Sequence, residues 1–137
     1  MKALIDTSSL FKKYVQEINS DKFEELVNKV TDVWVAPTTL LELYCTIKRR
    51  LDEKLLIPSE AEAIKSNIQR DFDYFTKILW DELLEDHCLN LSSKYGLKPL
   101  DLIQLSSGLI SNPDIFVTSD QRLYKLARKE LKKVILI

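Results

Sequence analysis

Four short apolar runs, separated by segments with helical periodicity, limit the folds open to this chain. The runs are Lys2 to Ile5, Val33 to Ala36, Ile115 to Thr118 and Val134 to Ile137. Each has the length of a strand and is bounded by polar or turn residues, as buried strands are. Because helical segments lie between them, we predict parallel strands joined by helical crossovers. The predicted fold class is α/β, with a short, mostly parallel sheet of about four strands flanked by helices.

Helix signals occupy the segments between these runs. Helices are predicted to begin at or beside Ser20, Thr39, Ser59, Asp81, Pro99 and Gln121. Two of the starts, Thr39–Glu42 and Ser59–Glu62, have the capping-box pattern. Gly96 is predicted to end the fourth helix in a left-handed conformation. The helix after Pro99 is apolar on most sides, so we predict that it lies centrally in the fold.

The composition describes one compact domain over residues 1–137. Hydrophobic residues make up 45% of the chain and charged residues 30%, with 2 Gly and 4 Pro, which argues against a disordered or fibrous chain. Cys45 and Cys88 belong to no zinc-ligand pattern, and Ala3–Ile5 is too short for a signal peptide or a membrane span. We therefore predict a cytoplasmic protein with no membrane partner. Because the net charge is −1, any nucleic-acid contact depends on a local basic surface.

Four acidic residues stand where a parallel sheet gathers its ligands. Asp6 follows the first apolar run, Glu42 lies in the first helical turn after the second, and Asp120 follows the third. Asp101 lies at the start of the central helix. Ligands of open parallel sheets bind beyond the carboxyl ends of the strands. We therefore predict that these four carboxylates converge on one crevice.

Each acid also has an ordinary structural explanation. Acids are favoured at helix starts by roughly 0.3 to 1 kcal/mol, Glu42 completes a capping-box pattern with Thr39, and Asp101 follows Pro99 in a first turn. Together, however, they need a cation, since two carboxylates about 4 Å apart repel by roughly 4 kcal/mol at an effective dielectric of about 20. Oxygen ligands favour magnesium or manganese, and such sites suit phosphodiester hydrolysis.

The acidic residues lie in four motifs that together resemble the PIN-domain family, and in particular its VapC-type toxins. The motifs are Leu4–Leu10 (LIDTSSL), Leu40–Leu43 (LLEL), Tyr95–Leu105 (YGLKPLDLIQL) and Val117–Leu123 (VTSDQRL). The resemblance covers nearly the whole chain and keeps the family's order. It implies a PIN-like three-layer α/β fold. The residues before Asp101 and the stretch Ser106–Gly108 depart from the common pattern, which leaves the RNA target open.

The resemblance also implies an activity, a cofactor and partners. Asp6, Glu42, Asp101 and Asp120 are implied to be catalytic and to bind one or two Mg²⁺ or Mn²⁺ ions. The hydroxyls of Thr7, Ser8 and Thr118 are implied to help hold water or metal. The implied activity is metal-dependent endoribonuclease cleavage of RNA by the toxin of a toxin-antitoxin pair, with a small antitoxin and a second copy of the chain as partners.

Other readings of the sequence stay open. Within the family, the chain could be a housekeeping RNA-processing nuclease or a binding module without catalysis. A phosphoacceptor signalling domain needs an acidic pair after its first strand, where this chain has Asp6 alone. Lys12, Lys13 and Arg49 are candidates for holding RNA phosphates. The aromatic residues Phe72, Tyr74, Phe75 and Trp80 could stack bases, line a partner groove or belong to the core, and the single histidine, His87, is interpreted as structural.

Overall fold

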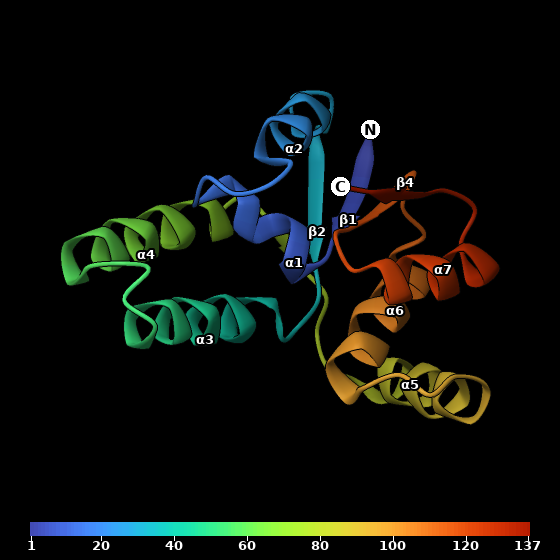
Figure 1. Ribbon diagram of the computed structural model, residues 1–137. Helices are drawn as coiled ribbons and strands as arrows, with labels where there is room; N and C mark the ends of the chain where they lie inside the picture. Colours follow the sequence, from blue (N-terminus) through green and yellow to red (C-terminus); the bar gives the residue numbers. More distant parts are fainter.

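The computed structural model describes all residues, 1–137, as a five-stranded parallel sheet between two layers of helices (Figure 1). The strands are β1 (Lys2–Ile5), β2 (Asp32–Val35), β3 (Thr76–Lys77), β4 (Ile115–Thr118) and β5 (Val134–Leu136). Their order across the sheet is β3-β2-β1-β4-β5, and each neighbouring pair is parallel. The predicted α/β class with three layers is confirmed.

The strand β3 was not predicted, so the sheet has five strands instead of about four. It is only two residues long and pairs with Trp34 and Val35 at the edge of the sheet. The amide of Ile78 extends this ladder by donating to the carbonyl oxygen of Val35 at 2.9 Å. A two-residue strand is too short to form an apolar run that the sequence would reveal. The packing of the surrounding chain, and not a local pattern, brings it to the sheet edge.

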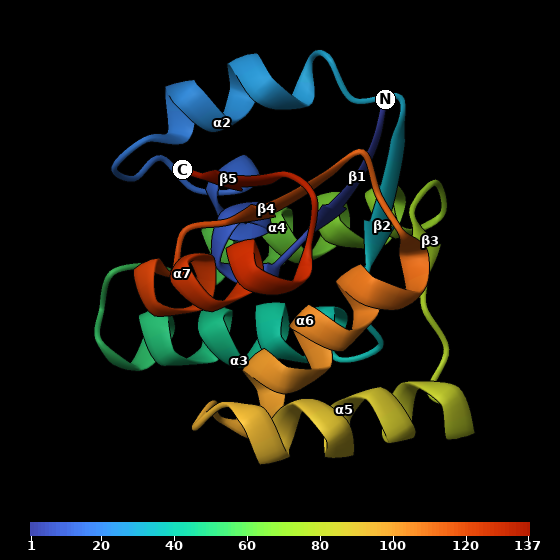
Figure 2. The ribbon, with the colours of Figure 1, turned by 90° about the vertical axis from the view of Figure 1, so that its right-hand side faces the viewer.

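Alternation of side chains along β1 and β4 divides the core into two parts. Ala3 and Ile5 face a cluster with helices α1 to α4, whereas Leu4 and Phe116 face a second cluster with α5, α6 and α7. The helices are α1 (Thr7–Leu10), the 3-10 helix η1 (Phe11–Lys13), α2 (Ser20–Val27), α3 (Thr39–Asp52), α4 (Pro58–Phe72), α5 (Glu82–Lys94), α6 (Pro99–Ser111) and α7 (Gln121–Glu130). Figures 1 and 2 show the two groups of helices on opposite faces of the sheet.

Several predicted helix ends differ from the structure. The carboxylate of Glu42 accepts from the Thr38 hydroxyl at 2.8 Å instead of completing a box with Thr39. In α4 it is Glu60 that reaches back, accepting from the Ile57 amide at 3.0 Å. The end of α5 uses no left-handed glycine, because Tyr95 turns extended there and leads directly toward the next helix.

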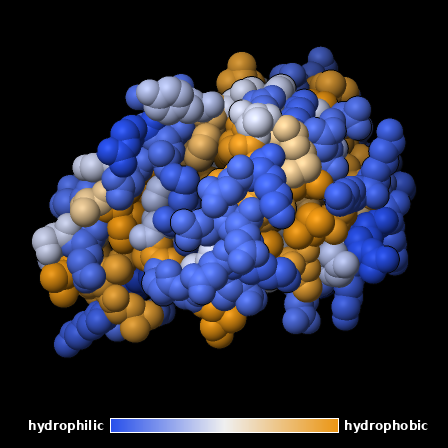
Figure 3. All heavy atoms as spheres, turned by 90° about the horizontal axis from the view of Figure 1, so that it is seen from above, coloured by the Kyte–Doolittle hydropathy of each residue, from blue (hydrophilic) through white to orange (hydrophobic).

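The fold brings α6 very close to the sheet at Gly108. A Cβ atom on this residue would lie 2.9 Å from Cδ2 of Phe116 and 3.1 Å from Cδ1 of Leu131. The central position predicted for α6 is thus correct, and the absence of a side chain at Gly108 permits it. On the outside, polar side chains cover most of the face seen in Figure 3, with separate apolar areas between them. No helix combines the length and apolar composition needed to cross a bilayer.

Candidate metal centre

The candidate site lies where the strand order reverses, between β1 and β4. From β1 the chain proceeds outward through β2 to β3, whereas β4 and β5 extend the sheet in the other direction. In open α/β sheets, ligands bind at such a switch point beyond the carboxyl ends of the strands. Asp6 follows β1 directly, and Asp120 follows β4 after one residue. In Figure 1, α1 and α3 begin beside the carboxyl ends of β1 and β2, which brings Glu42 to the same end of the sheet.

Asp6 is buried and held by three hydrogen bonds. Its Oδ1 accepts from the Ser8 hydroxyl at 2.6 Å and from the Ser9 amide at 3.1 Å. Its Oδ2 accepts from the Thr118 hydroxyl at 2.6 Å. Only 3% of the residue is exposed. Burial raises the pKa of this carboxyl from its ordinary 3.8 to about 6; the hydrogen bonds oppose the rise and the charge of Glu42 adds to it.

The same hydroxyl groups connect the two strand ends that flank the switch point. The Ser8 hydroxyl accepts from the Ser119 amide at 3.0 Å, and the Thr118 hydroxyl accepts from the Asp120 amide at 3.0 Å. Asp120 in turn caps α7, because its Oδ1 accepts from the Leu123 amide at 2.7 Å. Asp6 is therefore linked through Thr118 to the backbone of Asp120, although 114 positions separate them in the sequence.

Glu42 is held by Gln104, a residue that the motifs contain but that we did not predict as part of the site. The Gln104 amide nitrogen lies 2.9 Å from Oε2 of Glu42 and 3.1 Å from each of the Thr7 and Thr39 hydroxyls. Gln104 is 2% exposed, and its Oε1 has no hydrogen-bond partner. A polar amide in the apolar first half of α6, three residues after Asp101, was the signal available in the sequence.

Asp101 and Asp120 form a second acidic pair. Partial burial and the charge of Asp120 raise the pKa of Asp101, while Lys98 and Arg122 act in the opposite direction. Arg122 also donates to the carbonyl oxygen of Gly96, which ties the loop before Asp101 to the first turn of α7. The structure thus places two cationic side chains next to this acidic pair.

The charge of Glu42 acts on Asp6, and the charge of Asp120 acts on Asp101, so the structure relates the four acids as two pairs and does not gather them into one group. No three His, Cys, Asp or Glu side chains are close enough to form a ready-made metal-binding group. The residues nevertheless fit a hard divalent cation, because each pair combines carboxylate oxygens with mutual repulsion that a cation offsets. The buried Oε1 of Gln104 has no hydrogen-bond partner, and a water held by such an ion would supply a donor of the kind that this atom lacks.

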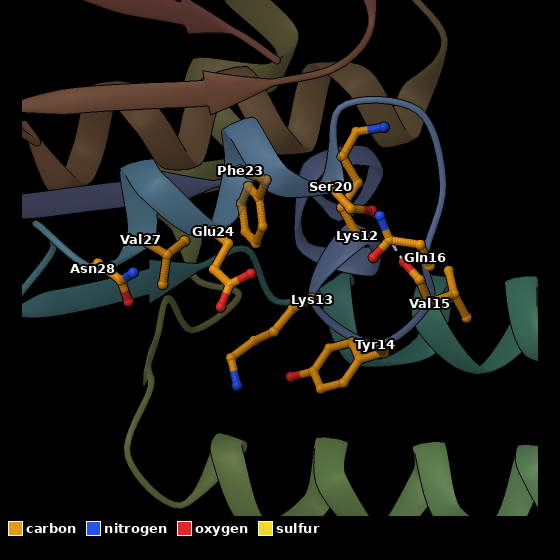
Figure 4. A pocket seen from close by; sticks show the side chains of 10 residues that line it. All are labelled: Lys12, Lys13, Tyr14, Val15, Gln16, Ser20, Phe23, Glu24, Val27 and Asn28. Carbon is orange, nitrogen blue, oxygen red and sulfur yellow. Dashed lines mark hydrogen bonds between the residues drawn. The ribbon is translucent and has the colours of Figure 1, made fainter.

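A groove of about 370 Å³ opens beside Glu42. Its lining includes Thr7, Ser8, Glu42, Thr46, Arg49 and Leu100. Of the three cations that the sequence suggested, only Arg49 lines this groove. Lys12 and Lys13 line a different cavity, of about 430 Å³, between η1 and α2 (Figure 4). There Lys12 pairs with Glu17 at 3.3 Å and Lys13 with Asp71 at 2.7 Å.

The predicted aromatic cluster separates into two parts. Phe72 and Phe75 contact each other with ring centroids 5.3 Å apart and pack on the core. Tyr74 and Trp80 are instead 83% and 53% exposed, so they do not belong to the core. His87 is partly buried on α5 and belongs to neither acidic pair.

The parallel sheet and the acids that follow its strands define an α/β protein with acidic residues at its topological switch point. The chain belongs to the PIN domain family, whose model matches residues 3–129, and the predicted family resemblance is thereby confirmed. Comparison with curated protein sequences gives no match.

Solved structures with the same fold are also found. A toxin-antitoxin complex from Klebsiella pneumoniae is similar with a TM-score of 0.68, 16% identity and 89% of each chain covered. VapBC2 from Rickettsia felis, bound to a promoter DNA fragment, has a TM-score of 0.67 and 15% identity, covering 100% of this chain and 98% of that one. FitAcB from Neisseria gonorrhoeae has a TM-score of 0.73 and 13% identity, covering 97% and 96%. At these identities the likeness concerns the fold.

Proposed function

We propose that this chain is a metal-dependent endoribonuclease that acts as the toxin of a toxin-antitoxin pair. The observation that carries the proposal is the position of Asp6 and Asp120 at the strand ends of the β1/β4 switch point, each paired with a second acid, together with the open groove that Glu42 lines. Membership of the PIN domain family supports nuclease chemistry, which gives these acids a common role. Helix capping needs only one carboxylate oxygen and does not explain why two acids are placed near each other. A bound cation would offset the repulsion within each pair.

In this proposal Asp6, Glu42, Asp101 and Asp120 hold one or two Mg²⁺ or Mn²⁺ ions. A bound ion supplies an activated water and stabilises charge on the phosphodiester oxygens. The chain's own contribution is to orient the ligands. Ser8 and Thr118 fix both oxygens of Asp6, which limits the rearrangement needed for binding.

Gln104 and Thr7 support the other end of the site. The Gln104 amide donates to Glu42 and holds its carboxylate in one orientation. Thr7 accepts from the same amide and lines the groove, so its hydroxyl proton is directed away from Gln104. We assign this hydroxyl to holding water or the metal beside Glu42.

The toxin role rests on the comparisons. One of the similar solved structures is described as a toxin-antitoxin complex, and another, VapBC2, is described as bound to a DNA fragment from its promoter. We therefore propose a small antitoxin as partner, and a second copy of this chain in a homodimer. A housekeeping nuclease would have no antitoxin reading frame beside its gene, and a silent binding module would bind RNA without cutting it.

The test is cleavage of a mixed RNA pool by the purified chain in Mg²⁺, Mn²⁺ or EDTA. We expect cleavage with either metal, none in EDTA, and loss of at least a hundredfold in rate in Asp101→Asn. Asp86→Asn is the matched control, since Asp86 is an exposed acid on α5. Cleavage that persists in EDTA, or at an unchanged rate in Asp101→Asn, would refute the assigned metal site.

A further inference from the structure

The groove beside Glu42 contains a cationic side chain that has no counter-ion. Arg49 lines the groove together with Thr7, Ser8 and Glu42 and is exposed. None of the six ion pairs of the chain includes it. An arginine that faces a concave surface without a partner is available to bind an anionic ligand there.

The neighbours of Arg49 in the same helix are differently placed. Lys48 pairs with Asp52 at 2.6 Å and does not line the groove. Arg50 lines it but is bound to Glu17 at 2.6 Å and stacks 4.9 Å from the centroid of the Phe11 ring. Of three consecutive cations, only Arg49 combines a place in the groove with a free guanidinium group.

We propose that Arg49 binds a phosphate of single-stranded RNA in this groove and holds the strand next to the acids. The proposal rests on the nuclease function proposed above. A planar guanidinium group matches the phosphate oxygens with two parallel hydrogen bonds. A concave groove of about 370 Å³ admits a flexible single strand more readily than a duplex, whose phosphates lie on a convex surface.

The phosphate at Arg49 is a neighbour of the one that is cut. Arg49 lies seven residues, or two turns, after Glu42 on the same side of α3, which is about 10 Å along the helix axis. Helical side chains lean toward the N-terminus, so Arg49 leans toward the acids without reaching them. Arg49 is therefore a substrate-binding residue and not part of the metal site.

The groove offers charge but no surface for stacking bases. Its one aromatic residue, Phe11, is 3% exposed and lies beneath Arg50. Contacts to the RNA backbone position a strand, whereas contacts to base edges select its sequence. We therefore expect Arg49 to contribute equally to the binding of different RNA sequences.

The experiment measures binding of a labelled single-stranded RNA by fluorescence anisotropy across a salt series. Asp101→Asn is the common background, so that no RNA is cut. We compare Arg49→Gln with Lys48→Gln, which removes the same charge from the same helix outside the groove. Arg49→Gln is expected to weaken binding about tenfold at low salt and to reduce the slope of log K against log salt by about 0.7. Lys48→Gln should leave the slope unchanged.

Cleavage kinetics without the Asp101 substitution give a second readout. Arg49→Gln should raise KM while kcat stays near that of wild type, as expected for loss of uniform binding. Equal binding constants and salt slopes for Arg49→Gln and Lys48→Gln, with metal-dependent cleavage intact, would overturn the role of Arg49 alone. A wild-type chain that neither binds nor cuts RNA would refute the nuclease function, and the role of Arg49 with it.

Discussion

Replacing Asp6 by asparagine should stabilise the metal-free protein. The Asp6 carboxyl is buried, and its pKa is raised from 3.8 to about 6 in the folded chain. Between pH 3.8 and about pH 6, Asp6 keeps its proton in the folded state but has released it in the unfolded state. Stability therefore falls as pH rises through this window, and the full loss is present above about pH 6. The shift corresponds to about 3 kcal/mol at 1.36 kcal/mol for each pH unit.

Asparagine has no charge to bury, so it removes the loss of stability caused by the buried Asp6 carboxylate while keeping the helix cap. It is as good a cap residue as aspartate, so the hydrogen bond from the Ser9 amide survives. We expect the free energy of unfolding of Asp6→Asn to exceed that of wild type by about 3 kcal/mol at pH 8. By the same linkage, the difference should be about half as large at pH 5. For a domain of this size, 3 kcal/mol corresponds to about 10 °C in Tm.

The assay is thermal and urea unfolding followed by circular dichroism, in EDTA, at pH 5 and pH 8. Asp86→Asn serves as the control, because Asp86 is an exposed acid whose loss of charge should change stability by less than about 0.5 kcal/mol. The reasoning is refuted if Asp6→Asn is no more stable than the control at pH 8, or if the difference does not shrink at pH 5. Adding Mn²⁺ should raise the Tm of wild type but not of Asp6→Asn.

Two further outcomes follow from the same structure. The proposed metal site needs Asp6 in its ionised form, so Mn²⁺ affinity measured by calorimetry should fall below about pH 6. At pH 6, where about half of the Asp6 carboxyls carry a proton, each ion bound should release about half a proton; affinity that is flat from pH 5 to 7 would contradict this. Gly108→Ala should lower the free energy of unfolding by about 1 to 3 kcal/mol in urea titrations, because its Cβ would overlap Phe116. Gly96→Ala, whose Cβ would meet Arg122 at an ordinary 3.6 Å, should be nearly neutral.

The sequence predicted those parts of the fold that a local pattern determines. Four strands were recognised because each is a short apolar run between polar residues, and their parallel arrangement followed from the helices between them. The strand β3 escaped because two residues make no pattern. Gly96 was misassigned because a glycine after a helix suggests a left-handed end, whereas here Tyr95 leaves the helix extended and its hydroxyl donates to Glu130 at 2.6 Å.

The candidate site was predictable to the extent that strand ends determine it. Asp6 and Asp120 could be proposed as neighbours because both follow parallel strands, and their connection through Thr118 agrees with that argument. Gln104 could not be proposed in this way. Its three acceptors, on Thr7, Thr39 and Glu42, lie 97, 65 and 62 positions away. Only the complete fold, in which α6 comes near the starts of α1 and α3 at Gln104, brings these groups together, and no periodicity in the sequence encodes it.

Capping and metal binding are compatible roles for these acids, although the sequence presented them as alternatives. Asp6 caps α1 through Oδ1, and Asp120 caps α7 through Oδ1. A carboxylate has two oxygens and about four acceptor positions, so one cap leaves capacity for a cation. The cap fixes the orientation of the carboxylate before any ion arrives. Burial of Asp6 should lower the stability of the metal-free chain, and binding of the proposed cation would offset that loss. An acid kept only for capping would have no reason to be buried next to another carboxylate, and the unfolding experiment on Asp6→Asn measures this difference directly.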